Sequence, residues 1–153
     1  MSKKTLRGLD EVFAFAIERE EQAAELYAKL REKATGQTLK TLAEELRLQE
    51  LQHKRILLEL KTAGRAPDAP GFVVDLGVSD HTVDEPLRPD MTVPELLLFA
   101  AKKEQQAALL YEGLAGRATS GSERRTFEFL AAQEKTHKLR LESEYEANVL
   151  TEN

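Results

Sequence analysis

Residues 49–54 read Gln-Glu-Leu-Gln-His-Lys, and residues 133–138 read Gln-Glu-Lys-Thr-His-Lys. Each stretch holds a glutamate followed three residues later by a histidine. Residues three apart on an α-helix lie on nearly the same face, so both side chains can bind one metal ion. The two glutamates, Glu50 and Glu134, are 134 − 50 = 84 residues apart, and the histidines repeat at the same interval. One such pair is weak evidence for a metal site, whereas its recurrence at a fixed offset indicates an internal duplication.

The same offset relates most of the helical sequence. Residues 10–34 match residues 94–118 at many positions, among them Glu20 with Glu104. Further identities extend through the two quoted stretches and their flanks, so each half of the chain carries the same two segments. The sequence therefore predicts a duplicated helical hairpin. The matched pairs include Phe15/Phe99, Gln22/Gln106, Ala23/Ala107, Leu26/Leu110, Tyr27/Tyr111, Gln49/Gln133, His53/His137 and Leu57/Leu141.

Apolar residues recur with helical spacing through about residues 9–63 and again through about residues 92–148. Each stretch divides into two helices at a glycine-containing turn. Residues 64–91 are rich in proline and glycine and are predicted to be a long crossover connection. We predict one all-α domain over residues 1–153, a four-helix bundle in up-down-down-up order whose hairpins are related by a pseudo-twofold axis.

Local signals predict where the helices begin. Residues 92–95 form a capping box with proline in the first turn, residues 120–123 resemble a second helix start, and Thr38 is the expected N-cap of the second helix. Within the crossover, residues 72–74 offer a short extended piece. His81, which stands among aspartates, is expected to be a solvated loop residue rather than a ligand.

The register of the first hairpin places its glutamates at one height. If the first helix ends near residue 34, Glu20 lies 34 − 20 = 14 residues from the turn, roughly 21 Å along the helix. If the second helix starts near residue 38, Glu50 lies 50 − 38 = 12 residues beyond it, roughly 18 Å. The second hairpin repeats this spacing with Glu104 and Glu134. We therefore expect the four glutamates and two histidines to converge on one level of the bundle.

Four carboxylates in an apolar core require a positive counter-charge. Each unpaired carboxylate would cost several kcal/mol of desolvation, and no lysine or arginine interrupts the apolar stripes at this level. Two divalent ions would balance four glutamates, with two neutral imidazoles completing the set. Mixed carboxylate and imidazole ligation suits iron or manganese, and zinc or cobalt also bind such donors. The alternative is a metal-free bundle held by buried Glu–His hydrogen bonds.

Residues 16–27 with the first Glu-x-x-His pair, and residues 104–111 with the second, resemble the ferritin-like di-iron carboxylate superfamily and are most similar to rubrerythrin. The resemblance covers nearly the whole chain except the crossover. It implies a bound pair of iron ions and assigns a role to each member of the motif. It implies that Glu50 and Glu134 bridge the ions, that Glu20 and Glu104 are terminal carboxylates, that His53 and His137 each bind one ion, and that Tyr27 and Tyr111 hydrogen-bond ligand carboxylates.

The chain departs from the rubrerythrin pattern in two ways, at the position of Ala107 and in its lack of cysteine, and it also lacks the marker of a haem site. Rubrerythrins carry a further carboxylate one turn after the glutamate of the third helix, where this chain has Ala107, and the equivalent position in the first helix is Ala23. Leu51 replaces the methionine that would mark a bacterioferritin-like haem site. Because the chain has no cysteine, it offers no ligands for rubredoxin-type iron, and we expect a separate electron-donor protein.

Composition excludes several other classes of function. The net charge is −5 with both signs interspersed, so a nucleic-acid partner is not expected. The absence of cysteine excludes a disulfide framework, an iron–sulfur cluster and a thiol nucleophile. The most apolar stretch after the N-terminal region, residues 93–101, is far too short to span a membrane, and the N-terminal residues do not form a signal peptide. We expect a cytoplasmic protein that forms a homodimer or a larger homo-oligomer.

The favoured function is a rubrerythrin-like di-iron oxidoreductase that reduces hydrogen peroxide or dioxygen with electrons from an external donor. Ferroxidase activity is a close alternative because the ligand set is symmetric. A non-catalytic iron-binding or storage protein is the third alternative.

Overall fold

The computed structural model describes residues 4–5, 9–62, 73–74 and 87–152, and four long helices dominate them. The prediction of an all-α four-helix bundle is confirmed. The helices are α1 (Leu9–Lys33), α2 (Gln37–Thr62), α3 (Val93–Arg117) and α4 (Gly121–Glu152). Two short strands, β1 (Lys4–Thr5) and β2 (Val73–Val74), form an antiparallel pair.

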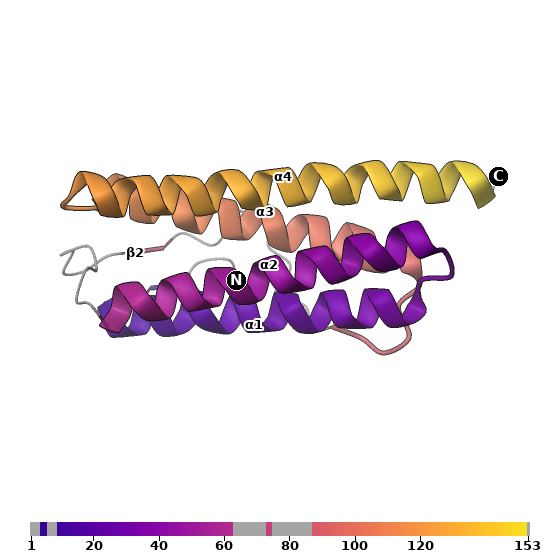
Figure 1. Ribbon diagram of the computed structural model, residues 1–153, viewed down its shortest axis with the longest axis horizontal. Helices are drawn as coiled ribbons and strands as arrows, with labels where there is room; N and C mark the ends of the chain where they lie inside the picture. Colours follow the sequence, from indigo (N-terminus) through magenta and orange to yellow (C-terminus); the bar gives the residue numbers. More distant parts are fainter. Residues whose placement is uncertain (1–3, 6–8, 63–72, 75–86, 153) are drawn as a thin grey trace.

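The helix directions follow the predicted order, with α1 and α4 running one way along the bundle and α2 and α3 the other (Figure 1). Helices α1 and α2 form one antiparallel hairpin, α3 and α4 form the other, and α1 also packs against α3. Helix α3 begins at the end of the bundle opposite to the end of α2, which gives the up-down-down-up order. Most of the predicted crossover over residues 64–91, including His81, lies outside the described residues. Val73–Val74 is extended, as expected for the short piece in this segment.

The helix starts follow from local hydrogen bonds. Thr92 and Glu95 form the predicted capping box of α3, with each side chain bonded to the backbone N–H of the other residue. Ser120 caps α4, since its hydroxyl accepts from the N–H of Glu123 at 3.1 Å. The predicted N-cap at Thr38 is wrong. The carbonyl of Gly36 accepts the first helical bond, from the N–H of Lys40 at 3.1 Å, so α2 begins one residue before Thr38.

The apolar core has two parts, one on each side of a polar layer. Each part receives residues from all four helices, and each fully buried leucine contributes about 1.5–3 kcal/mol. The two parts cover the polar layer from both directions along the bundle axis. One part includes Phe13, Leu57, Leu110, Leu114, Phe127 and Leu130, and the other includes Leu26, Leu30, Leu46, Leu96, Leu97 and Leu141. None of the helices described is both long enough and apolar enough to cross a bilayer.

Candidate metal centre

The polar layer between the two parts of the core contains all six predicted metal ligands. None is more than 2% exposed. Their ligand atoms form two groups, each with all atoms within 4.8 Å of one another. One group is Glu20, Glu50, His53 and Glu134, and the other is Glu50, Glu104, Glu134 and His137. Glu50 and Glu134 belong to both groups, so the arrangement is that of two adjacent positions with two shared carboxylates.

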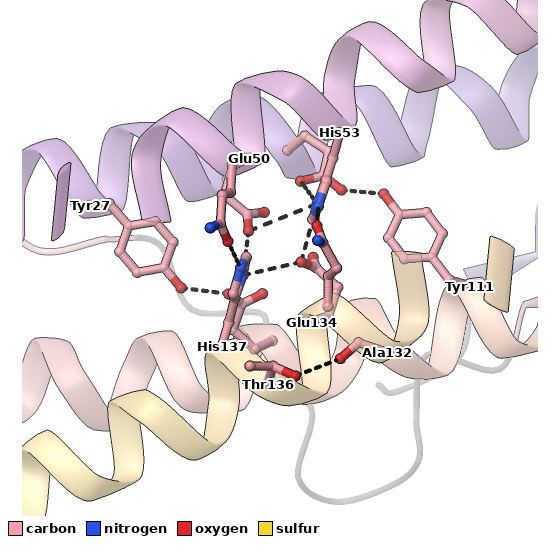
Figure 2. Close-up of polar contacts among 12 residues, drawn as sticks. Tyr27, Glu50, His53, Tyr111, Ala132, Glu134, Thr136 and His137 are labelled. Carbon is pink, nitrogen blue, oxygen red and sulfur yellow. Dashed lines mark hydrogen bonds and ion pairs between the residues drawn. The ribbon is translucent and has the colours of Figure 1, made fainter. Parts of the chain in front are cut away.

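Each histidine directs Nδ1 into the cluster. His137 Nδ1 lies 2.8 Å from Glu50 Oε1, 2.9 Å from Glu104 Oε2 and 3.3 Å from Glu134 Oε1. His53 Nδ1 lies 3.2 Å from Glu134 Oε1 and 3.6 Å from Glu20 Oε1. The two rings are nearly parallel, with an interplanar angle of 9° and centroids 5.8 Å apart (Figure 2). The pseudo-twofold relation of the hairpins thus extends to the imidazoles.

The opposite ring nitrogen of each histidine contacts a glutamine of the other hairpin. His53 Nε2 on α2 pairs with Gln133 Oε1 on α4, and His137 Nε2 on α4 pairs with Gln49 Oε1 on α2. An amide oxygen only accepts, so each Nε2 carries the hydrogen. In the neutral imidazole this tautomer leaves the Nδ1 lone pair facing the carboxylates. The sequence did not distinguish a surface position for these two glutamines from a position beside the ligands. The structure places both beside the histidines.

Two tyrosines approach the cluster from opposite sides (Figure 2). The Tyr27 hydroxyl donates to Glu104 Oε2 at 2.7 Å, and the Tyr111 hydroxyl donates to Glu20 Oε2. Each bond joins α1 to α3, so each tyrosine serves a glutamate of the other hairpin. Burial, with the charges of the nearby glutamates, raises the pKa of both phenols well above 10, and both therefore remain hydrogen-bond donors.

Burial and mutual repulsion give the acidic groups different proton affinities. Burial raises the pKa of Glu50 well above its usual value, and the charges of Glu104, Glu134 and Glu20 add to this effect. Burial and Glu134 raise the pKa of Glu104 to about 8. Burial also disfavours ionisation of Glu134, but its contacts with His137 and His53 prevail and lower its pKa to about 2.

The histidines bind protons more tightly than usual in the metal-free cluster. Burial lowers the pKa of each imidazole, but the adjacent carboxylates outweigh it. Contacts with Glu134 and Glu20 raise the pKa of His53 to about 11, and contacts with Glu104 and Glu134 raise that of His137 to about 9. Without metal, the carboxylates are thus neutralised partly by protons.

Unsatisfied atoms provide a test of whether a metal pair fits. Seven buried side-chain atoms lack a hydrogen-bond partner among the described residues, and five of them lie in this layer: both oxygens of Glu50, Oε1 of Glu20, Oε1 of Glu134 and Nδ1 of His53. Leaving one such group unsatisfied costs about 1–3 kcal/mol. All five atoms belong to the same cluster and are donors that iron, manganese, zinc and cobalt accept. The residues present therefore fit a pair of divalent ions.

A cavity of about 410 Å³ lies beside the cluster, between α1 and α3. Glu20, Glu50, Glu104 and Glu134 line its inner end together with the two tyrosines. Its walls are mainly apolar, and its outer part includes two cations. The walls and outer part comprise Ala23, Leu26, Leu87, Phe99, Ala107, Leu110, Arg19, Gln22, Glu25 and Lys103. Helical periodicity did not predict this cavity, although alanine at both position 23 and position 107 is a signal for it.

No protein-family model and no curated protein matches the sequence of this chain. Two solved structures do match its fold. A protein from Thermotoga maritima superposes with a TM-score of 0.74 at 22% identity, over 95% of this chain and 97% of that one. The fold is ferritin-like. The Thermotoga protein carries a provisional assignment as a ferritin-like diiron-carboxylate protein. The second, a hypothetical protein from Pyrococcus furiosus, superposes with a TM-score of 0.70 at 25% identity, over 91% of this chain and 89% of that one.

Proposed function

We propose that this ferritin-like protein is a di-iron oxidoreductase that reduces hydrogen peroxide or dioxygen with electrons from an external donor. The observation that carries the proposal is the pair of overlapping ligand groups that share Glu50 and Glu134. The provisional diiron-carboxylate assignment of the Thermotoga protein supports the same chemistry.

The overlap of the two groups assigns a role to each residue. Glu20 and His53 would hold one ion, Glu104 and His137 would hold the other, and Glu50 and Glu134 would bridge them. When bound, a pair of ferrous ions supplies one electron each, and two electrons with two protons convert hydrogen peroxide into two waters.

The chain itself supplies geometry and exclusion of water. The Tyr27 hydroxyl donates to Glu104 Oε2, the same oxygen that faces His137 Nδ1, and so fixes the orientation of that carboxylate in the cluster. Gln49 holds the ring of His137 with Nδ1 facing inward. The two apolar parts of the core close the layer along the bundle axis, so the cavity between α1 and α3 is the route by which a small oxidant reaches the cluster.

Two features favour ferroxidase activity as a second candidate. The two positions are nearly equivalent, each with one terminal glutamate, one histidine and the shared pair. Ala107 also stands where rubrerythrins carry a further carboxylate, so the chain lacks that ligand of the peroxidase family. Oxidation of ferrous ions followed by assembly into a large shell in solution would support ferroxidase and storage roles. A dimer that consumes peroxide with an added reductant would support the oxidoreductase.

Metal stoichiometry tests the site. We expect the purified protein to bind close to two Fe(II) per chain under anaerobic conditions, measured by equilibrium dialysis and elemental analysis. Glu50→Ala and Glu134→Ala remove a carboxylate from both positions and should reduce this number strongly. Glu59→Ala and Glu128→Ala are matched controls on the same two helices, because both side chains are exposed. Equal binding in all four variants would show that the cluster is not the metal site.

Stopped-flow oxidation of the Fe(II)-loaded protein tests the reaction. Absorbance is followed after mixing with hydrogen peroxide or with dioxygen in parallel. Faster oxidation by peroxide, with repeated turnover when a reductant is added, is the expected result. Preference for dioxygen with accumulation of ferric iron would favour the ferroxidase. Slow oxidation by both oxidants, without turnover, would refute both enzymatic functions.

A further inference from the structure

The cavity between α1 and α3 has far more space than hydrogen peroxide or dioxygen fills. We propose that it holds the hydrocarbon group of an organic hydroperoxide, ROOH, whose peroxide end faces the cluster. The substrates of the metal centre then include small alkyl and aryl hydroperoxides as well as hydrogen peroxide. The inference rests on the proposed function, because it places the metal pair at the inner end of the cavity.

The volume sets the size of the substrate. The cavity holds about 410 Å³, and one water corresponds to about 30 Å³ of liquid. Two metal ions and one water, each counted at that volume, would take about 90 Å³ and leave about 320 Å³. This space accommodates roughly ten non-hydrogen atoms. Hydrogen peroxide would fill a small part of it, whereas tert-butyl hydroperoxide lies well within the limit and cumene hydroperoxide is close to it.

The middle of the cavity is apolar on both sides. Ala23 and Leu26 on α1 are the pseudo-twofold equivalents of Ala107 and Leu110 on α3, and Phe99 adds an aromatic ring. The small alanines keep the space between the two helices open, since leucine at either position would fill part of it. Such walls gain free energy by covering a hydrocarbon group and offer no hydrogen bond to a polar one.

The inner end of the cavity is polar, because the four glutamates of the cluster and the two tyrosines line it. An organic hydroperoxide matches this division. Its O–O–H end can donate a hydrogen bond to a carboxylate oxygen, while the rest of the molecule is hydrocarbon. Because the molecule is neutral, its binding needs no counter-charge at the outer end of the cavity.

The reaction is the reduction proposed for hydrogen peroxide, with R in place of one hydrogen. The O–O bond breaks, and its two oxygens take up two electrons from the external donor and two protons from solvent. The products are the alcohol ROH and water, so no further co-reactant is needed.

Calorimetry on the Zn(II)-loaded protein tests binding, because zinc is redox-inert and the readout does not depend on turnover. Cumene hydroperoxide should bind at least about tenfold more tightly than hydrogen peroxide, with tert-butyl hydroperoxide between them. Ala107→Leu should weaken the binding of cumene hydroperoxide at least about tenfold, and so should Ala23→Leu, which narrows the cavity from the other helix. Ala14→Leu, at an exposed position of α1, should leave it unchanged. Each variant should retain two zinc ions per chain, which shows that the centre is intact.

Turnover of the Fe(II)-loaded protein with an added reductant tests the substrate class. Both cavity variants should lower kcat/KM for cumene hydroperoxide at least about tenfold and leave kcat/KM for hydrogen peroxide nearly unchanged. Equal affinity of the wild-type Zn(II)-loaded protein for all three peroxides would overturn the inference. Reduction of hydrogen peroxide alone would overturn it as well, and would leave the proposed function intact. Absence of turnover with every peroxide would instead refute the proposed function and the inference with it.

Discussion

Glu50→Leu should stabilise the metal-free protein while abolishing its metal site. Glu50 is fully buried, and although its Oε1 lies 2.8 Å from His137 Nδ1, neither of its oxygens has a partner with hydrogen-bond geometry among the described residues. Its raised pKa favours the neutral acid, so its removal leaves no unpaired charge in the cluster. His137 keeps Glu104 at 2.9 Å and Glu134 at 3.3 Å as counter-charges. A side chain positioned to bind metal is thus, without metal, a net cost to folding.

The size of the effect follows from the buried groups. Relief of an unsatisfied buried carboxyl is worth about 1–3 kcal/mol, and leucine replaces it with apolar contacts of similar volume. We expect the free energy of unfolding to rise by about 1–3 kcal/mol. For a domain of this length that corresponds to an increase in the melting temperature of about 2–12 °C. If the cluster were instead a structural Glu–His network, loss of one member would cost about 3–5 kcal/mol.

The assay is thermal and denaturant unfolding of the chelator-treated protein, repeated with two equivalents of Zn(II). Wild type should gain about 2.7 kcal/mol when the free metal is 100 times its dissociation constant, whereas Glu50→Leu should gain little. Glu104→Leu is the matched control. It removes the acceptor of the Tyr27 hydroxyl and of His137, and should therefore destabilise the metal-free protein. Destabilisation of metal-free protein by Glu50→Leu would refute the reasoning.

Three further predictions concern the surroundings of the cluster. Tyr27→Phe should lower the free energy of unfolding by about 1.5–3 kcal/mol in urea titrations, because Glu104 loses a buried donor; no change would show that the bond is not formed. Gln49→Leu should weaken Zn(II) binding about 10- to 100-fold in competition titrations, because it releases the ring of His137. Gln52→Leu, at an exposed position of the same helix, should leave the affinity unchanged. Equal affinities of the two variants would exclude a positioning role for Gln49. The pKa of Glu104 (about 8) and that of His137 (about 9) both lie above their values in the unfolded chain, so the free energy of unfolding of the metal-free protein should fall as the pH rises from about 5 to 9. Over the same range, the increase in melting temperature on adding Zn(II) should grow, because fewer protons compete with the metal. The opposite trends in calorimetry would contradict these pKa shifts.

Sequence periodicity established the four helices because each apolar stripe requires a neighbour to cover it. The fixed offset between Glu50 and Glu134 then related the two hairpins, and helix rise placed Glu20 and Glu104 at the same height. The structure brings these residues together with the two histidines at one level. Their action as metal ligands stays a prediction that the Fe(II) and Zn(II) measurements test.

The side-chain contacts between the two hairpins could not be predicted from helical periodicity and spacing. Periodicity fixes which face of a helix is buried, but it does not specify which residue of another helix lies opposite. Only the packing of α1 against α3 shows that Tyr27 bonds Glu104 of the other hairpin rather than Glu20 of its own helix. The same holds for Gln49, which reaches His137 across the bundle.

The sequence by itself determined the composition of the candidate centre, because spacing along a helix is a local property that the residues carry with them. The tertiary structure decided what surrounds it. Whether alanines at positions 23 and 107 leave a void depends on the separation of α1 and α3 and on the side chains between them. That separation results from packing over the whole bundle, which no local pattern encodes. The sequence therefore specifies the donor residues, whereas their hydrogen-bond partners and the cavity beside them form only when the chain folds.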